Sequence, residues 1–220
     1  MANPYWPFFD LKVRTPLVEL RVPDDDDLVE LANLSAKGVH SPDFMPFNIA
    51  WSIVPSPDRE RGVLQWAWRQ RGALSPDDWR LEFVVVKDSQ VIGAQGFGAQ
   101  RFSLTRVINS GSWLGLAHQG QGVGKEMRQA MLHLAFEGLG AEVAYSAAFD
   151  DNLASIGVSR SVGYEDNGDE LSPRGEDAVG RHIRFKIDRQ RWLERRRDDI
   201  EIVGLDPCLP LLGITAAAGT

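Results

Sequence analysis

The residues with the clearest chemical meaning form a glycine-rich segment, Gln119-Gly120-Gln121-Gly122-Val123-Gly124-Lys125. Glycine has no Cβ, so the backbone N–H groups beside it can approach a ligand closely. Helical periodicity follows the segment, and a helix start adds unpaired N–H donors and the positive end of the helix dipole. The segment therefore predicts a phosphate or pyrophosphate site, unless it is only a turn that joins a strand to a helix.

The spacing of these glycines argues against the common nucleotide motifs. Gly120-x-Gly122-x-Gly124 differs from the dinucleotide pattern G-x-G-x-x-G, and Glu126 follows Lys125 where a nucleotide P-loop has Ser or Thr. A dinucleotide site also belongs to an early β-α-β unit, whereas several predicted strands precede this segment. We therefore expect neither NAD nor ATP.

Hydrophobic periodicity predicts the elements that must position the segment. The helix after it has an apolar stripe typical of packing on a core, formed by Met127, Ala130, Met131, Leu134 and Ala135. We expect strands over residues 17–22, 82–87, 91–97, 107–116, 142–149 and 180–187, and helices over about 24–37, 59–72, 125–138 and 152–162. This order predicts a single α/β domain with a mixed sheet.

Composition and charge exclude several classes of protein. The chain has 220 residues, 43% of them hydrophobic, and a formal net charge of −7, which argues against general binding of nucleic acids. The one cysteine, Cys208, cannot form an internal disulfide, and no signal peptide or membrane-length apolar stretch is present. We expect a cytoplasmic protein without membrane partners. The acids Asp24 to Asp27 cap a helix in this interpretation, and no metal site is expected.

Three motifs together resemble the GNAT superfamily of acyl-CoA-dependent N-acyltransferases. Gln119 to Gly124 fits its pyrophosphate loop, Q/R-x-x-G-x-G/A, at every fixed position. Asn152-Leu153-Ala154-Ser155, followed by Gly163-Tyr164, is similar to its second signature, and Trp113-Leu114 is similar to the end of a splayed strand. The resemblance covers roughly residues 15–188. It implies a mixed, mostly antiparallel central sheet with splayed strands, flanked by helices.

Two narrower resemblances concern the branch of the family. The W-L pair four residues before Q-G-Q-G, and the opening Thr15 to Arg21, are similar to the branch that acts on ribosomal-protein N-termini, although Leu17 replaces its usual arginine. The stretches Gly38 to His40, Met45 to Trp51 and Gly111 to Leu116 resemble a smaller group of succinyltransferases.

The resemblance implies roles for individual residues. The N–H groups of residues 120–125 would bind the pyrophosphate of an acyl-CoA, and the backbone of 113–115 would pair with the pantetheine arm. Asn152 would hydrogen-bond that arm, and Ser155 would protonate the leaving thiolate, with Tyr164 as the second candidate. The implied cofactor-binding set is Trp113, Leu114, Gly115, Gln119, Gly120, Gln121, Gly122, Val123, Gly124, Lys125, Asn152 and Ser155. Two alternatives stay open: a Ser155 hydroxyl bonded to its own helix, and a Tyr164 that is only core.

Direct attack of a neutral amine on the thioester requires a general base, and the sequence leaves it open. The candidates are His40, Glu82, His118, Asp150 or a water relay. Of these candidate bases, His40 joins Ser155 and Tyr164 in the expected catalytic set, because it lies in an apolar loop, residues 38–58, that we expect to cover the site.

The donor is acetyl-CoA or succinyl-CoA, and the amine acceptor, a small molecule or a protein amine, is open. A buried succinyl carboxylate would need a cation or several N–H donors. The sequence offers five partners for it: His40, Asn48, Lys37, Arg101 and Arg106.

The expected organisation has three parts: an aromatic N-terminal arm (1–14), the acyltransferase domain (15–188) and a C-terminal extension (189–220). Apolar residues of the arm and the extension, such as Phe8 and Leu212, are expected outside the core, which predicts a homodimer or larger symmetric oligomer. Two other functions remain open: a CoA-binding regulatory module without catalysis, and a structural oligomer whose glycine loop binds nothing.

Overall fold

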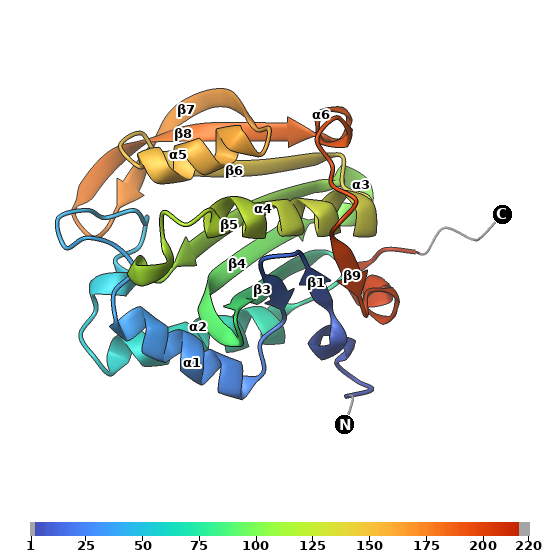
Figure 1. Cartoon of the computed structure of the whole chain (residues 1–220), viewed down its shortest axis with the longest axis horizontal. Helices are drawn as coiled ribbons and strands as arrows, with labels where there is room; N and C mark the ends of the chain where they lie inside the picture. The colour runs from blue at the N-terminus through green and yellow to red at the C-terminus, as the bar shows by residue number, and fades with distance from the viewer. Residues whose placement is uncertain (1–2, 216–220) are drawn as a thin grey trace.

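The computed structural model describes residues 3–215, which form one mixed sheet flanked by helices (Figure 1). Nine strands follow the order β7-β8-β6-β5-β4-β3-β2-β1-β9. Their bounds are β1 Lys12–Arg14, β2 Glu19–Arg21, β3 Asp78–Lys87, β4 Gln90–Gln100, β5 Val107–Leu114, β6 Val143–Phe149, β7 Glu165–Arg174, β8 Ala178–Asp188 and β9 Glu201–Val203. Among these described strands only β5 and β6 pair in parallel. The predicted α/β fold with a mixed, mostly antiparallel sheet is confirmed.

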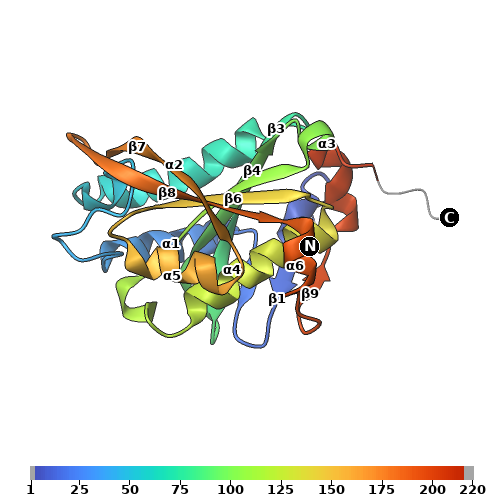
Figure 2. The same ribbon diagram turned by 90° about the horizontal axis from the view of Figure 1, so that it is seen from above.

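The helices cover both faces of the sheet. The longer ones are α1 Asp25–Ala36, α2 Asp58–Ala73, α4 Val123–His133 and α5 Leu153–Ser161, and α4 continues as a π-helical turn, η4 Leu134–Gly138. The short ones are η1 Pro7–Asp10, η2 Trp51–Ile53, α3 Phe102–Thr105, η3 Leu116–His118, α6 Arg189–Leu193 and η5 Asp206–Leu212. Seen from above, α2 and α4 lie on opposite sides of the sheet (Figure 2).

The two faces bury two separate sets of side chains. Val84 and Val86 of β3 pack with Leu31 and Leu34 of α1. The neighbouring residues of β3 point the other way and join the main core against α4, because successive side chains of a strand alternate between faces. All five predicted core residues of the helix after the glycine segment are buried in that main core. The 3.6-residue periodicity therefore identified the buried face correctly.

The sheet opens between its two parallel strands. Hydrogen-bonded pairing of β5 with β6 is limited to Val107–Asn109 opposite Val143–Tyr145. Beyond that point β5 continues to Leu114 and β6 to Phe149 without pairing with each other. We call the gap between residues 110–114 and 146–149 the splay. It is the strand divergence that the resemblance implied, and it leaves one edge of β5 without a strand partner.

The prediction that the terminal segments lie outside the core is wrong. Phe8 and Leu11 are fully buried in the main core, and so are Cys208 and Leu212. Strand β1 pairs with β9, so the first and last strands lie side by side and extend the sheet beyond β2 (Figure 1). Residues 1–2 and 216–220 of the predicted arm and extension lie outside the described residues. The premise for an oligomer is thus lost, and the oligomeric state stays a prediction.

Strand β7 was not predicted, and its burial pattern explains why. Nearly all of its residues are exposed, so it shows no alternation of apolar and polar positions. In residues 3–215 no helix is long and apolar enough to cross a membrane. The same described residues contain no group of three or more His, Cys, Asp or Glu side chains arranged to hold a metal ion.

Candidate functional site

The glycine loop presents free backbone donors at the start of α4. Gly120 and Gly122 have φ of +72° and +80°, a left-handed conformation that favours glycine, and Gly122 is the N-cap of α4. A Cβ built on either glycine would meet no atom within 4 Å, so both face open space. In the described chain, the backbone N–H groups of residues 120–124, at and before the first turn of α4, have no hydrogen-bond acceptor. This arrangement can hold an anion such as a pyrophosphate.

Three residues of the predicted loop make contacts within the protein itself. The Gln119 amide donates to the carbonyl oxygens of Val39 at 2.8 Å and Leu114 at 3.0 Å, so it fastens the loop to the end of β5. A Cβ on Gly124 would lie 3.2 Å from Val158 Cγ2, which shows that this glycine lets α5 approach α4 closely. Gln121 likewise bonds locally, to the carbonyl of Ala117 at 2.9 Å. Lys125 is exposed beside the loop.

Helix α5 brings Asn152 and Ser155 to the open end of the splay. Asn152 is the N-cap, and its Oδ1 accepts a hydrogen bond from the Ser155 N–H at 3.1 Å. This cap uses only the oxygen of the Asn152 amide. Within residues 3–215 neither the Asn152 NH₂ group nor the Ser155 hydroxyl forms a hydrogen bond, in contrast to Ser161, whose hydroxyl bonds the Val158 carbonyl at 2.8 Å. Both groups are free for a ligand.

Tyr164 lies deeper than Ser155. Its side chain is only 2% exposed, and its hydroxyl has no hydrogen-bond partner among the described residues. Burial raises the pKa of this phenol above its usual value, so the hydroxyl keeps its proton at neutral pH. The residue is both part of the core and an unused donor.

Two of the four candidate bases, His40 and Glu82, are engaged in hydrogen bonds with neighbouring groups. His40 Nδ1 lies 2.8 Å from the Ser41 carbonyl oxygen and Nε2 lies 2.7 Å from the Ser52 hydroxyl, so both ring nitrogens are engaged. A carbonyl can only accept, so we assign the proton to Nδ1. Glu82 is held by Arg80 and by the Trp66 indole N–H at 3.2 Å, on the face covered by α2.

The other two candidate bases lie at the ends of the splayed strands. His118 is part of η3, between β5 and the glycine loop, and is half-buried. Asp150 follows β6 and is exposed, and its backbone N–H bonds the Arg181 carbonyl at 2.9 Å.

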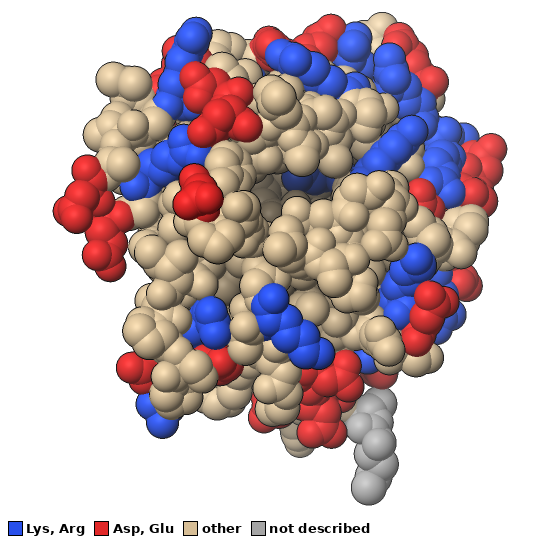
Figure 3. Space-filling model, turned by 60° about the vertical axis from the view of Figure 1, so that its left-hand side comes forward, with Lys and Arg blue, Asp and Glu red and all other residues tan. Residues whose placement is uncertain are grey.

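The apolar loop crosses from α1 to the β7–β8 hairpin, as a cover for the splay would. Its aromatic rings form a row, in which centroids are 5.4 Å apart from Trp113 to Trp51 and 5.1 Å apart from Trp51 to Phe47. At the far side the Asn48 amide donates to the Ser172 hydroxyl at 2.6 Å. Figure 3 shows a hollow on this side of the molecule, with mostly uncharged atoms around it, acidic atoms near one edge and basic atoms at its base.

Two of the cations expected for a donor carboxylate, Arg101 and Arg106, are not at the splay. Arg101 and Arg106 flank α3, at the opposite end of β5 from the glycine loop, and Arg106 bonds the Leu139 carbonyl at 3.3 Å. Asn48 is committed to the β7–β8 hairpin. Sequence reasoning missed Arg128 of α4, which bonds both strands of the splay. The available signal was an arginine next to Met127 on the core-facing side of the helix.

Comparison with known proteins identifies the family. The acetyltransferase (GNAT) domain family matches residues 18–165. Mycobacterium smegmatis RimJ in complex with CoA-disulfide has a TM-score of 0.68 at 17% identity, covering 93% of this chain and 95% of that one. A ribosomal-protein alanine acetyltransferase from Vibrio fischeri has a TM-score of 0.61 at 18% identity, covering 82% and 98%. A GNAT-family acetyltransferase from Bacillus anthracis has a TM-score of 0.64 at 15% identity, covering 81% and 99%.

Proposed function

Since the chain belongs to the GNAT acetyltransferase family, we propose that it transfers an acyl group from an acyl-CoA to an amine. One observation carries this proposal. The free N–H groups of residues 120–124, the unpaired edge of β5 and the free groups of Asn152 and Ser155 converge on one opening of the sheet. Each of them matches a different part of an acyl-CoA.

The donor would lie along β5. The loop N–H groups and the α4 dipole favour the pyrophosphate, and Lys125 adds a positive charge nearby. The amide groups of a pantetheine arm can replace the strand that β5 lacks over residues 110–114. The free NH₂ group of Asn152 can donate to a carbonyl of that arm. The thioester then lies inside the splay, next to Ser155.

The chemical step is a direct transfer. The amine nitrogen attacks the thioester carbonyl, a C–N bond forms, and the C–S bond breaks with the electron pair leaving on sulfur. The Ser155 hydroxyl donates the proton that the thiolate takes up and regains a proton from water, and Tyr164 is the second candidate because its phenol is protonated. The proton of the ammonium passes to water. His40 can accept this proton at Nε2 only by giving up its hydrogen bond with the Ser52 hydroxyl.

The acyl donor and the acceptor belong to the same proposal. The resemblance to succinyltransferases favours succinyl-CoA over acetyl-CoA. The fold shared with ribosomal-protein acetyltransferases makes peptide N-termini the first acceptors to test, followed by lysine side chains and polyamines.

Turnover tests this function. Release of free CoA from acetyl-CoA and succinyl-CoA is followed with a thiol reagent over a panel of amines. Cys208 will not interfere, since burial raises the pKa of its thiol to about 12. We expect amine-dependent CoA release with at least one donor. Binding of CoA without turnover of any amine would instead support the non-catalytic CoA-binding module, which the engaged ring of His40 favours.

A further inference from the structure

Arg128 of α4 is a buried cation without an anion. The residue is 3% exposed, and none of the ion pairs among residues 3–215 includes it. Its Nη1 donates to the Ser146 hydroxyl at 2.9 Å and its Nη2 to the Ser112 hydroxyl at 3.2 Å. Its Nε is buried and has no partner. Serine hydroxyls are neutral, so among the described residues no anion balances this charge.

This guanidinium spans the closed end of the splay. Ser112 belongs to β5 and Ser146 to β6, and the two strands stop pairing just before these residues, at Asn109 and Tyr145. The centroid of the Tyr164 ring lies 5.8 Å from the guanidinium carbon. A donor that enters at the glycine loop and follows β5 inward therefore reaches Arg128 with its acyl end.

The buried positive charge of Arg128 favours a ligand that carries a negative charge. Burying an ionised group is costly unless an opposite charge and hydrogen bonds compensate it. The planar guanidinium still has free N–H donors, and its fork matches a carboxylate well. An acetyl group brings no charge and would leave Arg128 as it is.

We propose that Arg128 receives the terminal carboxylate of a dicarboxylic acyl-CoA, with succinyl-CoA as the probe. The inference rests on the proposed function, because it places the acyl end of the donor in the splay. Arg128 takes no part in bond making and selects the donor. The competing role is that of a strut, in which the two serine bonds only hold the splayed strands at a fixed separation.

The first experiment uses the unaltered protein. Kd values for succinyl-CoA and butyryl-CoA are measured by calorimetry, since butyryl-CoA has the same four-carbon chain with a methyl group in place of the carboxylate. We expect succinyl-CoA to bind at least about tenfold more tightly. Equal affinities would overturn the inference and leave the acyltransferase proposal intact, whereas failure of both donors to bind would overturn the two together.

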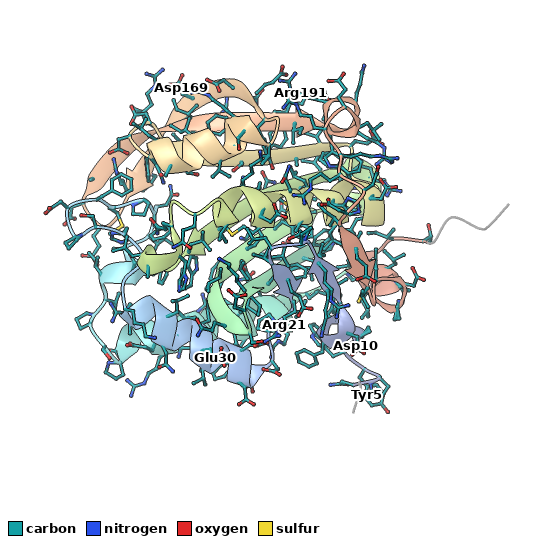
Figure 4. The ribbon with its side chains drawn as sticks, in the orientation of Figure 1. Tyr5, Asp10, Arg21, Glu30, Asp169 and Arg191 are labelled. Carbon is teal, nitrogen blue, oxygen red and sulfur yellow. The ribbon has the colours of Figure 1, made fainter. Side chains whose placement is uncertain are left out.

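The second experiment separates recognition from support of the fold. Arg128→Met keeps much of the stem and removes the charge, and Arg128→Lys keeps the charge without the fork. Arg181→Met is the matched control, because Arg181 pairs at 2.9 Å with Asp169, which lies on the outer side of the β7–β8 layer (Figure 4).

We expect Arg128→Met to lower kcat/KM for succinyl-CoA by about 10- to 100-fold and to leave butyryl-CoA nearly unchanged. The kcat/KM of Arg128→Lys for succinyl-CoA should lie between those of Arg128→Met and the unaltered protein. Arg181→Met should have the same kcat/KM as the unaltered protein. An equal loss for both donors would show a strut and overturn the inference. If Arg128→Met does not fold, the affinity ratio of the unaltered protein still decides.

Discussion

At the start of α5, Asn152 caps the helix and leaves polar groups of Asn152 and Ser155 free. The Asn152 oxygen caps the helix, so that the free Ser155 hydroxyl and the Asn152 NH₂ group are held in place for a ligand. The cap is therefore structural and functional at once, and single substitutions separate the two uses.

Replacing Ser155 by Ala tests the general acid. The substitution removes the hydroxyl and keeps the backbone N–H that Asn152 caps. We expect kcat to fall by about 100-fold with little change in the Kd of acyl-CoA. Steady-state kinetics and calorimetry measure the two quantities. An unchanged kcat would assign the proton to another group, and Tyr164→Phe would be examined next.

Replacing Gly122 by Val tests the anion site. The new side chain would project into the open space where we place the pyrophosphate, and the φ of +80° adds strain of about 1–2 kcal/mol. We expect CoA binding to be lost in a folded protein. Gly168→Val is the matched control, since Gly168 also has a φ of +80° but lies in β7. Calorimetry with CoA decides, and equal affinity in the two variants would refute the site.

At the scale of elements, helix α4 performs two tasks at its two ends. Its N-terminus presents donors at the glycine loop, and its C-terminal part packs against α6 through His133, whose ring lies 6.0 Å from that of Trp192. Desolvation by burial lowers the pKa of His133 below its usual value. The folded state therefore resists protonation of this ring.

This shift gives a pH prediction with a definite sign. Above the unfolded pKa of about 6.5 the histidine is neutral in both states and contributes no penalty. As the pH falls below that value, the unfolded chain binds the proton more readily, and stability is lost. We expect His133→Leu to show a smaller loss of unfolding free energy between roughly pH 7.5 and 5.5, measured by urea denaturation. An equal loss of unfolding free energy in His133→Leu and the unaltered protein would contradict this prediction.

For the whole molecule, the first and last strands of the described chain, β1 and β9, complete the sheet. Strand β9 pairs with β1, and Leu212 of η5 is fully buried in the main core. We expect Leu212→Ala to lower the free energy of unfolding by about 2–5 kcal/mol, because it leaves a cavity in that core. Denaturation by urea measures the loss.

Light scattering of the same Leu212→Ala variant examines the predicted oligomer. Because Leu212 packs within its own chain, the mass should equal that of the unaltered protein, whether this is a monomer or a dimer. A drop in mass on substitution would return the C-terminal segment to an interface. If Leu212→Ala left the free energy of unfolding unchanged, the C-terminal segment would be dispensable to the core.

The sequence alone determined the α/β class, the main helices and strands, and the glycine loop at the start of α4. These features depend on local spacing: a 3.6-residue apolar stripe, glycines at fixed positions and the capping acid Asp24 each act within a few residues. Strand β7 was missed because it is polar on both faces, and local periodicity carries no signal in such a strand.

Only the tertiary structure decided which distant residues meet. Arg128 became a candidate for donor recognition only because it bonds Ser112 and Ser146, which lie on two strands that diverge. Of the five partners that the sequence offered instead, the fold places Arg101 and Arg106 at the other end of β5. Phe8 and Leu212 belong to one core because β1 pairs with β9. Such contacts depend on the register of strands far apart in the chain, and no local pattern encodes that register.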